Sequence, residues 1–229
     1  MSLPDGVQRR TFDIRKTTAS SSATHQKATR SGDSEDVLAT RGEPVYGEPV
    51  VEGWRRWDAY RSKLGATFEH GLDTGLSGGD SVLYLGAANG TTVSHVADFA
   101  GPTYAVEFAP RPVRDLLDVA EDRGNLFPLL KDARKPETYA HVVEAELDAI
   151  VQDVATRGQA DVALSNRQFL AEDGRFVGAI KARSEDVTRE PEAVFEDVLD
   201  RLRDGYEVLE TERLEPYHDD HLAVVATPK

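Results

Sequence analysis

The sequence predicts an α/β fold in which helices cover both faces of a mostly parallel sheet. From Trp54 onward, apolar segments of strand length alternate with segments of helical periodicity, which is the pattern of repeated βαβ units. The last two strand-like segments, Tyr206–Leu214 and His221–Thr227, are joined by EPYHDD, which has no helical pattern. We therefore expect an antiparallel hairpin at the C-terminus.

The expected strands and helices follow one another regularly along the chain. A first helix at Trp57–Gly71 places Tyr60, Leu64 and Phe68 on one face at i, i+4 spacing. After it, strands are expected at Ser81–Gly86, Thr103–Phe108, Asn125–Leu130, Asp148–Asp153 and Phe176–Ala182. Further helices are expected at about Thr91–Phe99, Pro110–Arg123, Pro136–Glu146, Gly158–Leu170 and Pro191–Arg203, and three of these begin at a proline, which the first helical turn tolerates.

The N-terminal part of the chain is expected to form a small β-rich region over residues 1–52, followed by the main domain at residues 53–229. Extended segments are expected at Val7–Ile14 and Val45–Val51. Between them, the Ser/Thr-rich stretch Thr17–Asp36 has little to bury, so we expect a polar surface loop.

The composition is typical of a water-soluble globular protein, with 39% hydrophobic residues and a mean hydropathy of −0.47. No apolar run approaches the roughly 18 residues that span a bilayer, and the N-terminus lacks the apolar core of a signal peptide. The absence of cysteine excludes disulfides and thiolate metal sites. We expect a cytoplasmic protein with no membrane partner.

The net charge of −14 limits the partners that the chain binds directly. An acidic surface that is poor in lysine suits a salt-loving organism, where salt screens self-repulsion. The same charge argues against a free-standing nucleic-acid-binding protein, which normally carries a basic face. A nucleic acid would have to meet a local basic patch or arrive on another protein.

The strongest local signal is LYLGAANGTT at Leu83–Thr92, where a buried strand ends in a loop of small residues that opens a helix. Such a loop lies at the ligand-binding crevice of an open α/β sheet. Because Gly86 and Gly90 are its only glycines, the dinucleotide fingerprint is absent and a pyrophosphate is not expected. The helix start at Thr91 offers free N–H groups to a carboxylate. The alternative is a tight strand–helix turn without a ligand.

Three acidic residues follow three successive expected strands: Glu107, Asp132 and Asp153. At the position of Glu107 a carboxylate accepts hydrogen bonds from both ribose hydroxyls, and Phe108 beside it offers a flat apolar face to a purine. Asp132 is expected to accept from an adenine amino group, and Asp153 to hold the amino group of an amino acid. Each alone is also explained as a chance surface residue. Together they predict a ligand with a ribose, a purine and an amino acid but no phosphate, namely S-adenosylmethionine.

Two lysines stand out because lysine is rare in this chain. Lys63 lies on the first expected helix, and Lys181 lies at the end of the fifth expected strand, at the same sheet edge as Asp153. Ordinary solvated lysines are the alternative for both. The turn HDDH at His218–His221 contains possible metal ligands, but an Asp-rich hairpin turn is usually just solvated, so we expect no metal site.

The sequence resembles the fibrillarin family, specifically the archaeal fibrillarin-like rRNA/tRNA 2′-O-methyltransferases. The stretches that carry the resemblance run in order from Val45 to the C-terminus: VYGE (Val45–Glu48), RSKLGA (Arg61–Ala66), VLYLGAANGTTVSHVAD (Val82–Asp98), VEFAPR (Val106–Arg111), DARKPE (Asp132–Glu137), QDVATRGQ (Gln152–Gln159), KARSEDVTREPE (Lys181–Glu192) and LEPYHDDH (Leu214–His221). The first 40 residues match poorly, and the polar loop looks like an insertion into the family's small β-rich N-terminal domain.

The resemblance implies a methyltransferase fold of the Rossmann-like class, with S-adenosylmethionine as cofactor, and it implies roles for individual residues. The implied cofactor-site residues are Gly86, Ala87, Thr91, Thr92, Glu107, Phe108, Asp132, Ala133, Asp153, Val154, Ala155, Thr156 and Gln159. Lys63, Asp153, Lys181 and His221 would form a catalytic tetrad. The family usually has Gln-Pro where this chain has Thr156-Arg157, so a side-chain amide contact at that point would be lost.

The implied activity is methylation of a ribose 2′-hydroxyl in ribosomal or transfer RNA. The implied partners are a Nop-domain scaffold protein, a kink-turn-binding protein and a C/D box guide RNA that selects the target by base pairing. Candidates for a local RNA-facing patch are Arg55, Arg56, Arg61, Lys131, Arg134, Lys135, Arg183 and Arg189. Two alternatives are a methyltransferase of the same fold acting on a protein or small molecule, and a non-catalytic assembly subunit.

Overall fold

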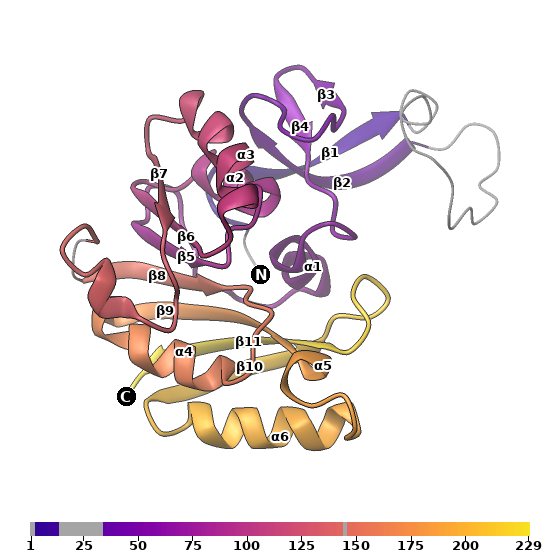
Figure 1. Cartoon of the computed structure of the whole chain (residues 1–229). Helices are drawn as coiled ribbons and strands as arrows, with labels where there is room; N and C mark the ends of the chain where they lie inside the picture. Colours follow the sequence, from indigo (N-terminus) through magenta and orange to yellow (C-terminus); the bar gives the residue numbers. More distant parts are fainter. Residues whose placement is uncertain (1–2, 14–33, 144–145) are drawn as a thin grey trace.

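The computed structural model describes residues 3–13, 34–143 and 146–229 and arranges most of them around one large sheet (Figure 1). This sheet has the strand order β10-β11-β9-β8-β5-β6-β7. The strands are β5 (Val82–Leu85), β6 (Thr103–Glu107), β7 (Leu126–Leu130), β8 (Leu147–Gln152), β9 (Leu170–Lys181), β10 (Tyr206–Arg213) and β11 (His221–Pro228). β5 to β9 are parallel, whereas β11 runs antiparallel to β9 and β10 antiparallel to β11. The predicted mostly parallel sheet and C-terminal hairpin are confirmed.

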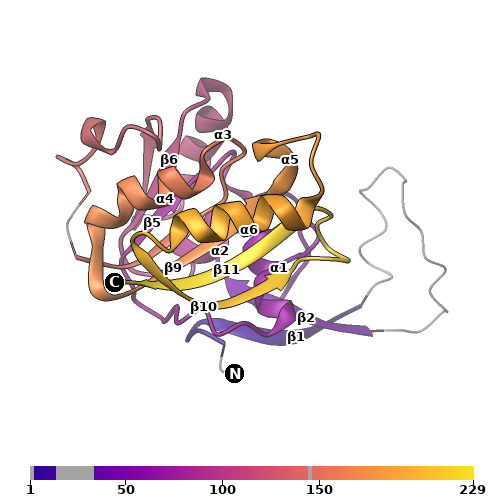
Figure 2. The same cartoon turned by 90° about the horizontal axis from the view of Figure 1, so that it is seen from below.

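Helices cover both faces of this sheet (Figures 1 and 2). α1 (Lys63–His70), α2 (Thr91–Ala97) and α3 (Pro110–Glu121) lie on one side, and α4 (Gln159–Asn166) and α6 (Pro191–Leu202) lie on the other. A short helix, α5 (Ala182–Glu185), directly follows β9. Successive side chains of β5 point to opposite faces of the sheet, so β5 contributes to both layers of the core. Leu83 and Leu85 pack with α4 and α6, whereas Val82 and Tyr84 pack with α1 and α2. Among the described residues, no helix combines the length and apolar character needed to cross a bilayer.

Two of the predicted helices differ in the structure. At Pro136–Glu146 the described residues form only a short 3₁₀ helix, η2 (Pro136–Thr138), followed by turns. Turns bury the Tyr139 and Val143 side chains here without a continuous helix. The first helix starts at Lys63, where the Ser62 hydroxyl accepts a hydrogen bond from the Gly65 amide (3.0 Å) and caps it. Tyr60 therefore precedes the helix and is 61% exposed, so its predicted place on one helix face with Leu64 and Phe68 is wrong.

Other element boundaries shift by smaller amounts. The expected helix Gly158–Leu170 becomes α4 followed by a 3₁₀ turn, η3 (Arg167–Phe169). β9 begins at Leu170, earlier than the expected start at Phe176. These differences do not change which residues stand at the carboxyl ends of the parallel strands.

A second, smaller antiparallel sheet is formed by the N-terminal part of the chain. Its strands are β1 (Val7–Asp13), β2 (Ser34–Arg41), β3 (Val50–Val51) and β4 (Trp54–Arg56), in the order β1-β2-β4-β3. β2 begins inside the stretch expected to be a loop, whose residues 17–33 lie outside the described part, and only Val50 and Val51 of the expected strand Val45–Val51 form a strand. Because β4 belongs to this sheet, we propose that the N-terminal region ends after Arg56 rather than at residue 52.

Buried charges join the small sheet to the main domain. Arg55 on β4 has no exposed surface, and its Nε lies 3.0 Å from Glu48 and 3.5 Å from Asp98 at the end of α2. Asp98 also binds Arg123, at 3.1 Å. Paired buried charges of this kind leave no free cation for a partner. The expectation that Arg55 belongs to an RNA-facing surface patch is therefore wrong.

His95 lies within this buried junction and should make stability depend on pH. It stacks on Trp57, its Nδ1 lies 2.7 Å from the Thr40 hydroxyl, and its Nε2 lies 2.9 Å from the Tyr46 hydroxyl. Burial, together with Arg55 and Arg123, holds the pKa of His95 well below its ordinary value. Below about pH 6.5 the unfolded chain therefore binds a proton that the folded protein does not.

The free energy of unfolding should consequently fall as the pH decreases from about 6.5 to 5. Chemical denaturation across this range measures the decline. His95→Gln should be less stable at neutral pH and should show a shallower decline, although not a flat one, since burial also lowers the pKa values of His218 and His221. An equally steep decline in the variant would contradict the assignment to His95.

Candidate active site

A cavity of about 430 Å³ opens at the carboxyl ends of β5, β6, β7 and β8. β5 has β6 on one side and β8 on the other, so this is the point where the strand order reverses and where open α/β sheets bind ligands. The cavity is lined by Lys63, Gly86, Ala88, Val106, Glu107, Phe108, Lys131, Asp132, Ala133, Arg134, Asp153, Val154, Ala155, Thr156 and Val162. Its volume is in the range of small-molecule sites.

In the loop after β5, the backbone at Gly86 lies close to the backbone of Asp153, which follows β8. Gly86 has φ +86°, and a Cβ atom there would lie 2.2 Å from the carbonyl oxygen of Asp153, so only glycine fits. Ala88 lines the cavity, whereas the expected cofactor residues Ala87, Thr91 and Thr92 do not. Thr92 is buried, and the Thr91 hydroxyl donates to Asn89 (3.1 Å). These three residues thus lie outside the wall of this cavity, and their contact with the cofactor stays a prediction.

Glu107 and Phe108 form one side of the cavity at the end of β6. The two Glu107 carboxylate oxygens accept hydrogen bonds from the Ala88 amide (3.0 Å) and the Ala109 amide (2.8 Å). These bonds fix the carboxylate at the cavity while leaving lone pairs for hydroxyl donors. The Phe108 ring lies beside it at the cavity and is 70% exposed, so its apolar face is open to a ligand.

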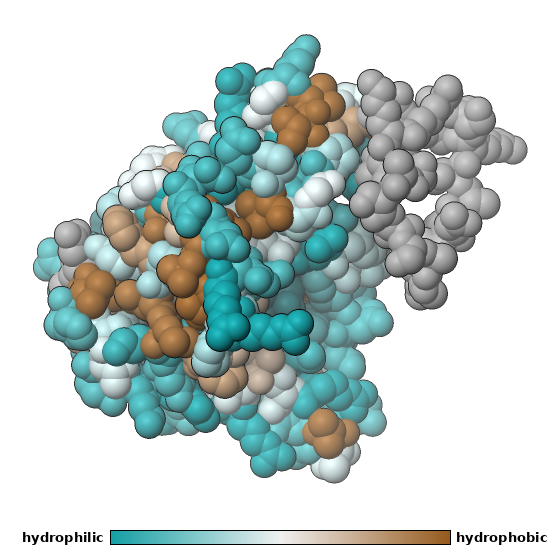
Figure 3. Space-filling view, turned by 45° about the horizontal axis from the view of Figure 1, so that its top comes forward, coloured by the Kyte–Doolittle hydropathy of each residue, from teal (hydrophilic) through white to brown (hydrophobic). Residues whose placement is uncertain are grey.

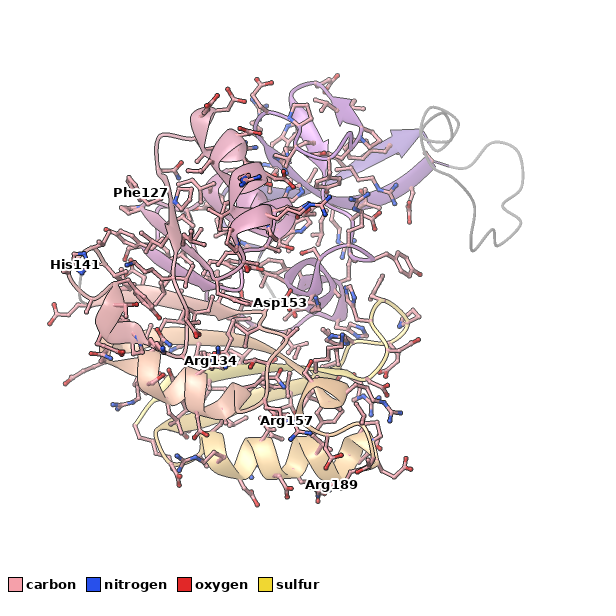
Figure 4. All side chains as sticks on the ribbon, viewed as in Figure 1. Phe127, Arg134, His141, Asp153, Arg157 and Arg189 are labelled. Atoms are coloured by element: carbon pink, nitrogen blue, oxygen red, sulfur yellow. The ribbon has the colours of Figure 1, made fainter. Side chains whose placement is uncertain are left out.

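Asp132 and Ala133 line the cavity beyond β7, together with Arg134. The Arg134 guanidinium binds the Asp132 carboxylate (2.7 Å), and this hydrogen bond lowers the pKa of Asp132. Arg134 is itself exposed (Figure 4). Asp132 therefore stays ionised at the cavity rim.

Asp153 directly follows the central strand β8 and makes the principal charge contact of the site. Its carboxylate accepts a hydrogen bond from the Lys63 ammonium at 3.0 Å, although the two residues are far apart in the sequence. Val154, Ala155 and Thr156 continue the cavity wall, whereas Arg157 is exposed outside it (Figure 4). The structure thus brings together Lys63 and Asp153, two of the four residues that the resemblance places in a catalytic tetrad.

Lys181 and His221 lie beside each other just outside the cavity. They are directly paired in the β9–β11 ladder. The Nδ1 of His221 lies 2.6 Å from the Asp219 carbonyl, which only accepts, so Nδ1 carries the proton of the neutral ring and Nε2 is left as an acceptor. Burial lowers the pKa of His221, and the nearby Lys63 charge adds to this effect.

His218 lies beside His221, near Lys63 and Asp153. From the sequence it was considered only as a possible metal ligand. Its Nε2 donates to the Ala59 carbonyl (2.8 Å), its ring lies 5.7 Å from that of His221, and its pKa is lowered by burial and by Lys63. Asp220 pairs instead with Arg183 at 2.9 Å. Within the described parts of the chain, no three acidic, histidine or cysteine side chains gather as a metal site would require.

Gln159 does not line the cavity as expected but holds the backbone of Lys181. Its side-chain oxygen accepts from the Lys181 amide (2.9 Å), and its side-chain nitrogen donates to the Lys181 carbonyl (3.1 Å). The pairing of β8 with β9 ends at Gln152 and Gly178, so β8 does not reach Lys181. The Gln159 side chain instead makes the hydrogen bonds to the Lys181 backbone that a longer β8 would make. The Glu185 carboxylate in turn accepts from both nitrogens of Gln159. Gln159 is therefore a positioning residue for Lys181.

Replacing Gln159 by methionine keeps its length and removes both hydrogen bonds to Lys181. We expect methyl transfer to slow by about tenfold to a hundredfold, since small displacements of a reacting group have effects of this size. The affinity for S-adenosylmethionine should change little. Asn125→Ala, which removes hydrogen bonds to the Ala97 and Ala100 carbonyls, is the control for general destabilisation. If Gln159 acts only through Lys181, Gln159→Met should slow methyl transfer little when Lys181 is already alanine. If Gln159→Met slowed the Lys181→Ala enzyme by as much as it slows wild type, this role would be refuted.

The residues of the cavity fit S-adenosylmethionine. A fixed carboxylate, an exposed aromatic ring and two further carboxylates from Asp132 and Asp153 match a ribose, a purine and two amino groups. The lining contains no glycine-rich phosphate cradle, in agreement with a ligand that lacks phosphate.

Comparison with known proteins gives consistent matches over most of the chain. A family model described as Fibrillarin matches residues 25–229. A fibrillarin-like rRNA/tRNA 2′-O-methyltransferase of Halobacterium salinarum is 76% identical over 229 residues, covering 100% of both chains. A fibrillarin/Nop5p complex contains a chain 41% identical with a TM-score of 0.80, covering 85% of this chain and 95% of that one. Aeropyrum pernix fibrillarin, solved with natively bound S-adenosyl-L-methionine, is 44% identical with a TM-score of 0.75, covering 83% and 89%.

Proposed function

This chain belongs to the fibrillarin family, and on that basis we propose that it methylates the 2′-hydroxyl of riboses in ribosomal and transfer RNA, with S-adenosylmethionine as cofactor. The observation that carries the proposal is the cavity at the switch point of the sheet, where Glu107, Phe108 and Asp153 converge beside Lys63. Fold, cavity chemistry and family all support the same reaction class.

Within this cavity, we infer that Glu107 accepts hydrogen bonds from the ribose hydroxyls of the cofactor while Phe108 packs against its purine. Asp132 would accept from the adenine amino group, and Asp153 would hold the amino group of the methionine part. The cofactor supplies a methyl group already activated by the sulfonium charge. The protein residues then have to orient the acceptor, exclude water and manage one proton.

Lys63, Asp153, Lys181 and His221 are the residues that we propose to act on the acceptor hydroxyl. The Lys63–Asp153 contact fixes both side chains at the border of the cavity. Lys181 either takes the hydroxyl proton as a neutral amine or stays cationic and stabilises the developing alkoxide. His221, neutral and protonated on Nδ1, adds no competing positive charge next to Lys181.

We further propose that the enzyme works in the cytoplasm as the catalytic subunit of a ribonucleoprotein. The other members would be a Nop-domain scaffold, a kink-turn-binding protein and a C/D box guide RNA. Figure 3 shows one face of the molecule, on which apolar groups lie among hydrophilic side chains. Of the expected RNA-facing cations, Arg56, Arg134, Arg183 and Arg189 are paired with carboxylates. In the described chain, Arg61, Lys131 and Lys135 form no such ion pair.

Reconstitution with the scaffold, the kink-turn-binding protein, a guide RNA and labelled S-adenosylmethionine tests the proposal. Methylation should occur at the guide-specified ribose and should depend on the partners, because the net charge of −14 opposes direct phosphate contacts. If the assembled wild type methylated a protein or a small molecule but not the paired RNA, the alternative acceptor class would replace RNA.

A further inference from the structure

Glu185 connects the segment that follows Lys181 to the start of α4. It is the last residue of α5, which begins directly after Lys181. One of its carboxylate oxygens accepts a hydrogen bond from the Gly158 amide (2.9 Å), and the other accepts from the Gln159 amide (2.7 Å). Gly158 is the N-cap residue of α4 and makes no side-chain capping bond itself. Glu185 therefore caps this helix from another part of the chain and places a negative charge where a helix start favours one.

The same carboxylate also orients the Gln159 side chain. The Gln159 side-chain nitrogen donates one hydrogen bond to Glu185 (2.9 Å) and another to the Lys181 carbonyl (3.1 Å). The side-chain oxygen then faces the Lys181 amide, from which it accepts at 2.9 Å. Half a turn of the Gln159 amide would point its oxygen at the Glu185 carboxylate and the Lys181 carbonyl, which are both acceptors. Glu185 thus stabilises the one orientation in which Gln159 satisfies the Lys181 backbone.

Lys181 depends on these side chains because only one neighbouring strand reaches it. β11 pairs with β9 as far as Lys181, whereas the pairing of β8 with β9 ends at Gln152. On the β8 side the Lys181 backbone is held by Gln159. Gln159 is held in turn by Glu185 and by the Gln152 side chain, which donates to the Gln159 carbonyl (2.9 Å). Of these contacts, those of Glu185 act directly on the amide that touches Lys181.

We propose that Glu185 is a positioning residue for methyl transfer, which fixes Lys181 through Gln159. This inference rests on the proposed function, in which Lys181 acts on the acceptor hydroxyl. Glu185 does not line the cofactor cavity, so it should affect transfer and not cofactor binding. Its effect should disappear once the hydrogen bonds between Gln159 and Lys181 are removed.

Single-turnover methylation in assembled particles measures the effect of Glu185 on transfer. Glu185→Ala should slow transfer by about tenfold, since small displacements of a reacting group have effects of this size, while the affinity for S-adenosylmethionine stays within about twofold. Glu185→Gln keeps the length of the side chain but offers one acceptor oxygen instead of two, so its rate should lie between those of wild type and Glu185→Ala. Normal turnover by Glu185→Ala would overturn the proposal.

A double-mutant cycle tests whether Glu185 acts through Gln159. In a Gln159→Met background the side-chain hydrogen bonds to Lys181 are already lost, so adding Glu185→Ala should slow transfer by less than about twofold. If Glu185→Ala slowed the Gln159→Met enzyme by as much as it slows wild type, Glu185 would act by another route and the proposal would be wrong.

Hydrogen exchange of the Lys181 amide tests the same contact without RNA. In the isolated protein, NMR should show several-fold faster exchange of this amide in Glu185→Ala than in wild type, because its acceptor on Gln159 is held less firmly. Unchanged protection of the Lys181 amide would contradict the proposal. Failure of the proposed function is a different result, because the wild-type particle would then not methylate RNA, whatever the exchange of this amide.

Asp148→Ala is the matched control for loss of a carboxylate that binds backbone. The Asp148 carboxylate accepts from the Ser81 amide (2.8 Å) and the Ser81 hydroxyl (2.7 Å), but it lies near the start of β8, at the opposite end of the strand from Asp153. This variant should keep the wild-type transfer rate and the protection of the Lys181 amide. Thermal melting of both variants measures their general destabilisation. Equal losses of rate in Asp148→Ala and Glu185→Ala would assign Glu185 a structural role only.

Discussion

Lys181→Ala is expected to abolish most methyl transfer while leaving the affinity for S-adenosylmethionine within a few-fold of wild type. Lys181 stands at the end of β9, paired with His221 and held from the other edge by the Gln159 side chain. It does not line the cofactor cavity, so its loss should spare cofactor binding. Removal of a positioned acid–base or electrostatic group slows a reaction by about a hundredfold or more.

Single-turnover methylation in assembled particles, with cofactor binding measured in parallel by calorimetry, separates the two effects. Lys181→Arg distinguishes the two possible roles of the lysine, since an arginine keeps the charge but does not act as a base near neutral pH. Substantial activity of Lys181→Arg would favour electrostatic stabilisation. Lys229→Ala, at the C-terminal end of the chain, is the control for loss of one positive charge. Normal turnover by Lys181→Ala would remove Lys181 from the catalytic group.

Glu107→Ala should weaken the binding of S-adenosylmethionine by about tenfold to a hundredfold without unfolding the protein. Hydrogen bonds to a charged group contribute roughly 1.5–3 kcal/mol, and this carboxylate is the one fixed at the cavity by two backbone amides. The truncation also frees the Ala88 and Ala109 amides. Glu107→Gln, which keeps the shape but loses the charge, should therefore lose less affinity than Glu107→Ala.

Calorimetric titration of the isolated protein measures this loss, and thermal melting without cofactor checks that the fold persists. Glu121→Ala, at the exposed end of α3, is the control for removal of one acidic residue. Unchanged affinity of Glu107→Ala would show that the cofactor ribose is held elsewhere.

The sequence alone was sufficient for the parallel sheet and for the carboxylates at its edge. Buried strands and helices differ in period, so their alternation is visible without tertiary information. Carboxyl ends of neighbouring parallel strands meet at one edge, and Glu107, Asp132 and Asp153 consequently line one cavity. The absence of a glycine-rich phosphate loop likewise followed from local residues.

Contacts between distant segments were decided only by the tertiary structure. The burial of Arg55 could not be read from its neighbours in the sequence, because one of its two carboxylate partners, Asp98, comes from another part of the chain. The cap at Ser62 moved Tyr60 out of the first helix, and its meeting with Tyr217 depends on the fold of the C-terminal hairpin. Gln159 was expected to contact the cofactor and instead completes the sheet beside Lys181, since β8 ends its pairing too early to do so. Periodicity and strand ends are local properties of the sequence, whereas burial, pairing and the direction of a side chain depend on which segments the completed fold places side by side.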